Sequence, residues 1–169
     1  MKKILFSLVI LSSLVACESK TEKTATAVPT DATGYILASS ENINMVKKAL
    51  DAGLISDSAV IMSIYADTAA VYDNMNKQSI VENLKMGAIF KAKGITVKLE
   101  KINDIFETVG LKPDDFGISN YVNVYFNASF TKGTQKIVTR INAVFAIKDG
   151  KVVTEWDTYD SAPIAELFK

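Results

Sequence analysis

The feature that most constrains this fold is a change in hydrophobic period near Ile95. Before it, in residues 39–55 and 76–94, apolar residues recur every three or four positions, as they do on the buried face of a helix. A shorter segment, residues 56–67, indicates another helix with Asp57 as its N-cap, and residues 68–74 indicate a short extended piece. After Ile95 the pattern alternates with a period of two, which is typical of strands.

Four alternating segments follow one another: residues 95–109, 118–130, 135–147 and 151–160. Short turns separate the last three, and Asp149-Gly150 is a dipeptide suited to a two-residue hairpin turn. Consecutive strands joined by tight turns pair in an antiparallel manner. The sequence therefore predicts an α+β domain in which three N-terminal helices cover one face of an antiparallel sheet.

The N-terminus predicts export and attachment to a membrane. Residues 1–16 carry two lysines and then an apolar run that is too short to span a bilayer, as in a signal peptide. The single cysteine, Cys17, ends the sequence LVAC, which resembles the lipobox of bacterial lipoproteins, where the cysteine is lipidated. The alternative is an ordinary signal peptide before a free cysteine. Residues 17–34 are rich in Thr, Ala and Lys, which indicates a flexible tether carrying the lipidated Cys17.

Composition limits the remaining possibilities. With 169 residues, 49% of them hydrophobic, the chain has material for one core, and we expect a single domain at residues 35–169. The formal net charge is zero, and the absence of a basic stripe argues against a nucleic-acid partner. The sequence has no histidine, which excludes a His-rich zinc site and a histidine base. We expect no metal and no cofactor.

Three segments together resemble a known family: YADTAAVYDN at residues 65–74, SIVENLKMGAIF at 79–90 and FAIKDGKVVTEWDTYD at 145–160. Their order and spacing resemble the nuclear transport factor 2-like fold, and its SnoaL-like branch in particular, over residues 38–165. This branch includes polyketide cyclases, ketosteroid isomerases and limonene epoxide hydrolases. The resemblance implies a cone, in which a strongly curved antiparallel sheet wraps around three N-terminal helices.

The resemblance also implies positions for a site. In the epoxide hydrolases of this fold an Asp-Arg-Asp set, joined by a Tyr-x-Asn pair, opens the epoxide. Tyr72 and Asn74 match the Tyr-x-Asn pair, and Asp157 falls on the aspartate of the final strand. Asn123 and Tyr125 stand where the family has its arginine and its other aspartate. Because half of the set is replaced, the resemblance does not predict epoxide hydrolysis by that mechanism.

Two orientations of residues 121–129 are open. The resemblance implies that the Tyr/Asn face points into the cone, beside Asp157. The alternative is that the opposite face, made of valines, phenylalanines and an alanine, packs on the helices, which leaves Asn123 and Tyr125 outside or in a dimer interface. Under the first orientation Asp157, desolvated by neighbouring aromatic rings, is a candidate general acid or base. The predicted ligand-binding residues are then Tyr72, Asn74, Asn123, Tyr125 and Trp156.

We therefore expect a membrane-anchored domain that binds a small, partly apolar ligand. A non-catalytic binding or accessory module is favoured, because the known catalytic sets are incomplete. The alternative is a cofactor-independent isomerase, cyclase or hydrolase that uses Asp157 with Tyr72 and Tyr125. The resemblance also implies a homodimer paired through the sheet. Glu18 is not the aspartate that retains some lipoproteins at the inner membrane, which favours the outer membrane.

Overall fold

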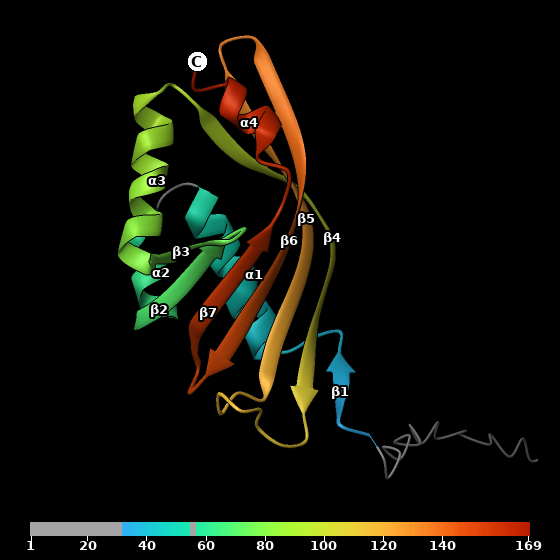
Figure 1. Ribbon diagram of the computed structural model, residues 1–169. Helices are drawn as coiled ribbons and strands as arrows, with labels where there is room; N and C mark the ends of the chain where they lie inside the picture. The colour runs from blue at the N-terminus through green and yellow to red at the C-terminus, as the bar shows by residue number, and fades with distance from the viewer. Residues whose placement is uncertain (1–31, 55–56) are drawn as a thin grey trace, which may run out of the picture.

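The computed structural model describes residues 32–54 and 57–169, in which helices cover one face of a seven-stranded sheet (Figure 1). The strand order is β1-β4-β5-β6-β7-β2-β3. The strands are β1 (Gly34–Leu37), β2 (Tyr65–Asp73), β3 (Asn76–Ser79), β4 (Thr96–Gly110), β5 (Asn120–Lys132), β6 (Gln135–Lys148) and β7 (Lys151–Thr158). The helices are α1 (Glu41–Leu54), α2 (Ser58–Ile64), α3 (Ile80–Ala92) and α4 (Ala162–Glu166). The predicted α+β class, with three helices before an antiparallel meander, is confirmed.

Local side-chain hydrogen bonds explain where the first three helices begin. The Ser40 hydroxyl accepts a hydrogen bond from the Ile43 amide at 3.0 Å, and the Asp57 carboxylate accepts one from the Val60 amide at 3.1 Å. Ser79 and Glu82 form a reciprocal capping box at the start of α3. Each cap satisfies an amide that has no partner inside its helix. The helix starts are therefore encoded locally.

The sheet curves around the helices, as Figure 1 shows. Strands β4 to β7 form an antiparallel meander, whereas β2 pairs with β7 in parallel and carries β3 at the edge. The pairing of β4 with β5 shifts register twice, once between Leu99 and Lys101 and once between Ile102 and Asp104. Such irregularities bend a strand and increase its twist. They let the long strand β4 follow the curved sheet.

The core lies on the concave face, between the sheet and α1, α2 and α3. On β5 it is formed by alternate residues that are at most 6% exposed: Val122, Val124, Phe126, Ala128 and Phe130. Phe145 of β6 and Val152 of β7 are completely buried on the same side of the sheet. The predicted inward orientation of the Tyr/Asn face of β5 is therefore wrong. The face with more apolar area is the one that packs on the helices, because its burial is the main driving force for folding.

Three short elements were not predicted from the sequence. The four residues of β1 pair with the end of β4, with Gly34 opposite Gly110. Asn76–Ser79, expected within a helix, instead forms β3, because Asn74 has a positive φ of 52° and turns the chain back against β2. Helix α4 has five residues and begins with Pro163 in its first turn. Short polar or exposed segments like these have almost no hydrophobic period.

The predicted signal peptide, residues 1–16, and Cys17 with most of the predicted tether lie outside the described residues. Within the described ranges, 32–54 and 57–169, no helix has both the length and the apolar character needed to cross a membrane.

Candidate functional site

A cavity of about 820 Å³ lies between the helices and the concave face of the sheet. This volume is within the range of small-molecule sites, which is roughly 300–1,000 Å³. Most of the wall is apolar, and α1, α3, β5 and β6 contribute to it, among others, Leu50, Leu84, Met86, Phe90, Phe130 and Phe145. The cavity can therefore hold a small molecule that is largely apolar.

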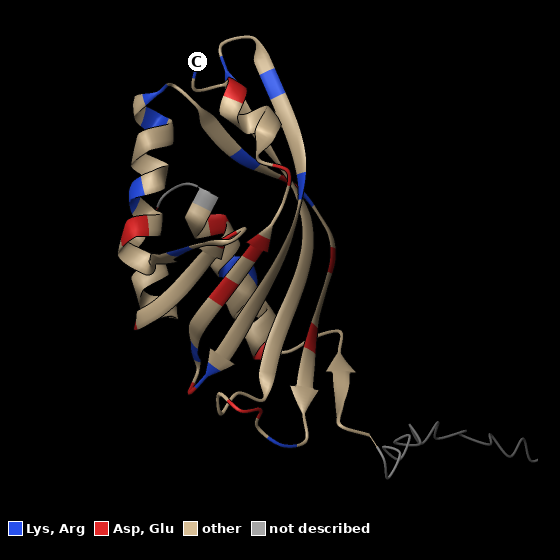
Figure 2. Cartoon of the chain, in the orientation of Figure 1, with Lys and Arg blue, Asp and Glu red and all other residues tan. Residues whose placement is uncertain are grey.

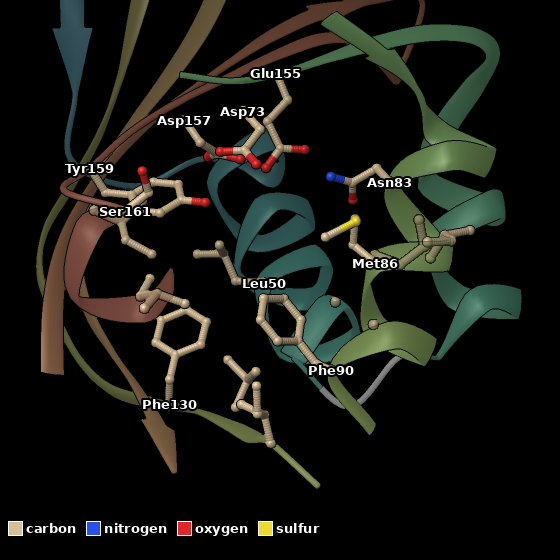
Figure 3. A pocket seen from close by; sticks show the side chains of 18 of the residues that line it. Leu50, Asp73, Asn83, Met86, Phe90, Phe130, Glu155, Asp157, Tyr159 and Ser161 are labelled. Carbon is tan, nitrogen blue, oxygen red and sulfur yellow. The ribbon is translucent and has the colours of Figure 1, made fainter. Parts of the chain in front are cut away.

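Three carboxyl groups lie together at one end of this cavity, from Asp73 of β2 and from Glu155 and Asp157 of β7 (Figure 3). Their proximity follows from strand register: Asp73 is opposite Asp157 in the parallel β2–β7 pair, and Val71 is opposite Glu155. Side chains along a strand alternate between the two faces of the sheet, so all four residues share one face. Val71 is completely buried, which identifies this face as the inner one.

Glu155 is held by a buried tyrosine. The Tyr65 hydroxyl donates a hydrogen bond of 2.5 Å to the Glu155 carboxylate, and Tyr65 is only 4% exposed. Burial raises the pKa of Glu155 to about 7, although hydrogen bonds from Tyr65 and Asp157 act in the opposite direction. Burial and the adjacent Glu155 also raise the pKa of Tyr65 well above its ordinary value. Tyr65 therefore stays protonated and keeps donating to Glu155.

Asp157 has the more strongly perturbed carboxyl group. Burial raises its pKa well above the ordinary value, and the nearby charges of Glu155 and Asp73 raise it further. Two carboxyl groups in contact cannot both ionise without strong repulsion, so they share one proton over a range of pH. Glu155 and Asp157 form such a pair near neutral pH. One group can then donate a proton while the other can accept one.

Among the residues that the structure describes, no cationic side chain forms an ion pair with this cluster. In the described part of the chain the ion pairs are Lys136–Glu100 and Lys169–Glu166, and neither involves a cavity carboxyl group. Lys91 and Lys98 contribute to the cavity wall, but both are exposed. In Figure 2 the red bands on β7 lie in the middle of the sheet, whereas the blue bands of α3 lie in the middle and at the C-terminal end of that helix. Among residues 32–54 and 57–169, no group of three Asp, Glu, Cys or His side chains is placed to hold a metal ion.

Tyr159 completes the polar end of the cavity. Burial raises the pKa of its hydroxyl, and so does a hydrogen bond to Asp73. Asn74 fixes the segment that carries it: the Asn74 side-chain oxygen accepts from the Tyr159 amide at 3.1 Å. The Asn74 amide donates to the Asp157 carbonyl oxygen at 2.8 Å. Asn74 thus positions the end of β7 and is not part of the cavity wall.

The structure separates the predicted site residues by strand face. Asp157 lines the cavity. Trp156 and Tyr72 do not, because each is adjacent in sequence to an inward-facing residue and so points outward. Their rings stack on the outer face of the sheet, with centroids 6.0 Å apart and planes inclined by 15°. Placing both Trp156 and Asp157 in one cavity was inconsistent with the two-residue period of the strand.

Asn123 and Tyr125 also lie on the outer face. The Asn123 side chain donates to the Thr108 hydroxyl at 3.4 Å, and Tyr125 is 38% exposed, with its ring 6.4 Å from that of Phe106. Neither residue lines the cavity. Their expected place in the site is wrong for the reason already given for β5: the valine and phenylalanine face is the one that packs inward.

Four residues at the polar end of the cavity were missed: Tyr65, Asp73, Glu155 and Tyr159. Part of the signal was available, because Glu155, Asp157 and Tyr159 are spaced by two and must share a face if the strand is regular. Asp73 lies between the two residues of the Tyr-x-Asn motif. Its position beside Asp157 depends on the β2–β7 pairing, which joins segments about 80 residues apart and has no local signature.

Comparisons with known proteins support the fold. No protein-family model and no curated protein sequence matches the chain. An LEH-like epoxide hydrolase from M. tuberculosis aligns with a TM-score of 0.54 and 15% identity, covering 75% of this chain and 87% of that one. IdmH, a candidate polyketide cyclase from Streptomyces antibioticus, aligns with a TM-score of 0.55 and 12% identity, covering 76% of this chain and 98% of that one. A candidate SnoaL-like polyketide cyclase from Jannaschia sp. aligns with a TM-score of 0.52 and 14% identity, covering 75% of this chain and 90% of that one.

These alignments span nearly the whole length of each matched structure at identities that reflect shared architecture. They agree with the curved, unclosed sheet and the helices on its concave face. The chain therefore has the SnoaL-like, nuclear transport factor 2-like fold.

Proposed function

We propose that the protein is a cofactor-independent enzyme of the isomerase or cyclase kind, which binds a small, largely apolar molecule and moves a proton with Glu155 and Asp157. The observation that carries this proposal is the pair of interacting carboxyl groups at the polar end of an apolar cavity of about 820 Å³. Asp157 is the candidate general acid, and the pair with Glu155 supplies the base. The solved structures named above include proteins described as cyclases and an epoxide hydrolase.

The carboxyl groups of the cavity lower the stability of the folded state. Burying an ionisable group without a counter-ion destabilises the folded state, and leucine or phenylalanine could line an apolar binding cavity without this loss of stability. Groups with strongly shifted pKa values collect at sites of proton transfer, because a group that titrates near the working pH can both give and take a proton. A pKa of about 7 for Glu155 meets that requirement.

The competing proposal, a binding module without chemistry, was favoured from the sequence because the known catalytic sets are incomplete there. That reasoning depended on Asn123 and Tyr125, which lie outside the cavity. The cavity holds a different set of polar residues: Tyr65, Asp73, Glu155 and Asp157. Within this set, Glu155 and Asp157 can share a proton. We therefore rank the enzyme above the binding module.

A direct test uses 5-nitrobenzisoxazole, a small aromatic compound whose ring opens when a base removes its C3 proton. The N–O bond then breaks and a coloured phenolate is released, so the rate reports any desolvated carboxylate that the molecule can reach. We expect ring opening at least tenfold faster than in buffer, with a rate that rises with pH through the titration of the pair. The Glu155→Gln/Asp157→Asn double variant should lose this acceleration.

Glu100→Gln is the matched control, because it removes an exposed carboxylate of β4 that is not in the cavity wall. It should retain the full rate. If the double variant and the parent react equally fast while the compound still binds, the cavity is a binding site without a usable base, and the binding module becomes the better description.

Attachment and assembly are further parts of the proposal. We propose that Cys17 is lipidated and anchors the domain at the outer membrane of the bacterial envelope. We also propose that two copies pair through the outer face of the sheet. Exposed Tyr125, Val138 and Trp156 support such a contact. Incorporation of labelled palmitate that is lost in Cys17→Ala, together with a dimeric mass in sedimentation, are the expected results. A monomeric mass would rule out the pairing.

A further inference from the structure

We propose that the molecule bound in the cavity is an amphiphilic amine, whose protonated nitrogen lies among Asp73, Glu155 and Asp157 and whose apolar part occupies the aromatic end. This inference names a ligand class for the site described above and so rests on the proposed function. Two independent features of the cavity lead to it: an imbalance of charge at one end, and an apolar space at the other.

The charge imbalance is large for so small a volume. Three carboxyl groups face one end of the cavity, where Figure 3 shows Tyr159 and the side-chain amide of Asn83 beside them. The Tyr65 hydroxyl, hydrogen-bonded to Glu155, and the Ser161 side chain are the other polar groups of this end. The two lysines of the wall, Lys91 and Lys98, are exposed. The two tyrosine hydroxyls, the Asn83 amide and the Ser161 hydroxyl are all neutral donors, so none of them balances the charge of the three carboxyl groups. A ligand with several N–H donors and a positive charge fits what remains.

The opposite end selects the rest of the ligand. Phe90 and Phe130 approach each other with ring centroids 5.6 Å apart, and Phe90 and Phe168 with centroids 5.4 Å apart. Met86 extends from α3 into the space between this aromatic end and the carboxyl groups (Figure 3). With about 30 Å³ for each water-sized group, a cavity of 820 Å³ has room for an aryl or alkyl chain as well as an amine.

Other ligand classes fit less well. A carboxylate or phosphate would be repelled by the cluster at close range. A neutral ketone could only accept the shared proton of the pair, and an alcohol could also donate one hydrogen bond, but neither carries the positive charge that would balance the cluster. A metal ion would need three ligands in suitable geometry, which the described side chains do not provide. Of the common classes, a cation with an apolar body complements both ends.

Binding of a cation has a measurable consequence. Because a positive charge favours the ionised form of nearby carboxyl groups, the pair should release its shared proton to the buffer when the ammonium group binds. The ammonium keeps its own proton, so up to one proton leaves for each molecule bound. A neutral ligand of the same shape should release none. This difference does not depend on knowing the natural ligand.

The experiment compares phenylalkylamines with two, four and six methylene groups against the phenylalkyl alcohols of the same lengths, by calorimetry near pH 7 in phosphate and in Tris. We expect at least one amine to bind tenfold or more tightly than its alcohol, with an enthalpy that differs between the buffers because protons are released. In Glu155→Gln/Asp157→Asn the preference for amine should fall to less than threefold, with alcohol binding unchanged.

The single variant Asp73→Asn keeps the test decisive if the double variant does not fold, since it should reduce amine affinity alone. Glu100→Gln should change the affinity for neither the amine nor the alcohol. Equal affinities for amine and alcohol, without proton release, would overturn the amine inference while leaving an apolar ligand site in place. Failure of every probe to bind would overturn the proposed function together with it.

Discussion

Two carboxyl sites in the same sheet, one buried and one partly buried, have pKa values shifted in opposite directions. Glu107 of β4 is only 1% exposed, yet its pKa is lowered: burial alone would raise it, but hydrogen bonds from Ser40, Asn42 and Asn120 outweigh burial. The amides of Asn42 and Asn120 each donate to Glu107 at 2.6 Å. Glu155 has the Tyr65 hydroxyl and a second carboxyl group beside it, and its pKa is raised.

The difference teaches that donors, and not burial alone, decide whether a buried carboxylate stabilises a fold. Glu107 joins the start of α1 to the sheet through neutral donors, and it lies at a helix N-terminus, where negative charge is favourable. Glu155 and Asp157 are short of donors and repel each other, so they cost stability. Glu107 therefore has a structural role. The stability of the fold does not explain the presence of Glu155 and Asp157, which is consistent with a role in function.

The largest expected effect is at Glu107. Glu107→Ala should destabilise the protein by about 3 kcal/mol, because it leaves two partly buried amide donors, those of Asn42 and Asn120, without an acceptor. Chemical unfolding in urea at pH 7 measures this. Glu107→Gln should cost less, since its oxygen can still accept one of the two hydrogen bonds. A loss below 1 kcal/mol for the alanine variant would mean that Glu107 is not the anchor of α1.

The matched control is Glu100→Ala on the same strand. Glu100 is exposed and pairs with Lys136 at 2.7 Å, and surface ion pairs contribute little. Its removal should leave the midpoint of unfolding unchanged within error. A substantial loss there would show that β4 is sensitive to any substitution, and the Glu107 result would then carry no information about buried donors.

The second effect has the opposite sign. Asp157→Asn should stabilise the protein by about 1 kcal/mol at pH 8, because it removes a carboxyl group whose ionisation the fold opposes, and the asparagine amide can still donate to Glu155. The sign follows from the raised pKa values. The folded state keeps protons that the unfolded chain has lost above about pH 4.5, so the stability of the parent falls as pH rises through about 7.

Unfolding free energies at pH 5, 6, 7 and 8 check this prediction. The parent should lose stability across the series, and Asp157→Asn should lose less of it. Glu107 contributes in the other direction, since a lowered pKa adds stability above the unfolded value that is lost only in acid. Parallel curves for parent and variant would show that Asp157 is not desolvated in solution.

The contrast also explains what the sequence could and could not predict. Helix starts were predictable because Ser40 and Asp57 cap the amides of residues three positions later, which is a local effect. The meander was predictable because short turns fix antiparallel neighbours. The inner face of β5 was misassigned because its strict alternation makes either face a candidate, and the family pattern was preferred over the larger apolar area of Val122, Phe126 and Phe130.

The two carboxyl sites depend on long-range pairing, which a local reading misses. Asp73 meets Asp157 through the parallel β2–β7 register, and Asn42 meets Glu107 across 65 residues. Neither Asp73 nor Glu107 is unusual in its sequence neighbourhood. Asp157 was named because it falls on the final-strand aspartate of the family that the sequence resembles. The resemblance thus located one carboxyl group, whereas its neighbour Asp73 is placed beside it by the long-range strand pairing.

The smallest expected effect on stability concerns the Tyr65 hydroxyl, which donates a hydrogen bond to Glu155. Tyr65→Phe removes the donor to Glu155 and should raise the pKa of Glu155 above about 7, because the hydrogen bond from Tyr65 stabilises its charged form. The cost in stability should be only about 0.5 kcal/mol at pH 5, where Glu155 is protonated in the folded state. Carbon-13 NMR titration of the carboxyl groups measures the pKa directly.

Tyr159→Phe is the control, because the Tyr159 hydroxyl interacts with Asp73 and not with Glu155. It should leave the titration of Glu155 in place while Tyr65→Phe moves it upward. A downward shift in Tyr65→Phe would mean that water replaces the hydroxyl and solvates the carboxylate. Water would then reach the polar end of the cavity. The difference between the pKa shifts of Glu155 and Glu107 would come from solvent access and not from hydrogen-bond donors.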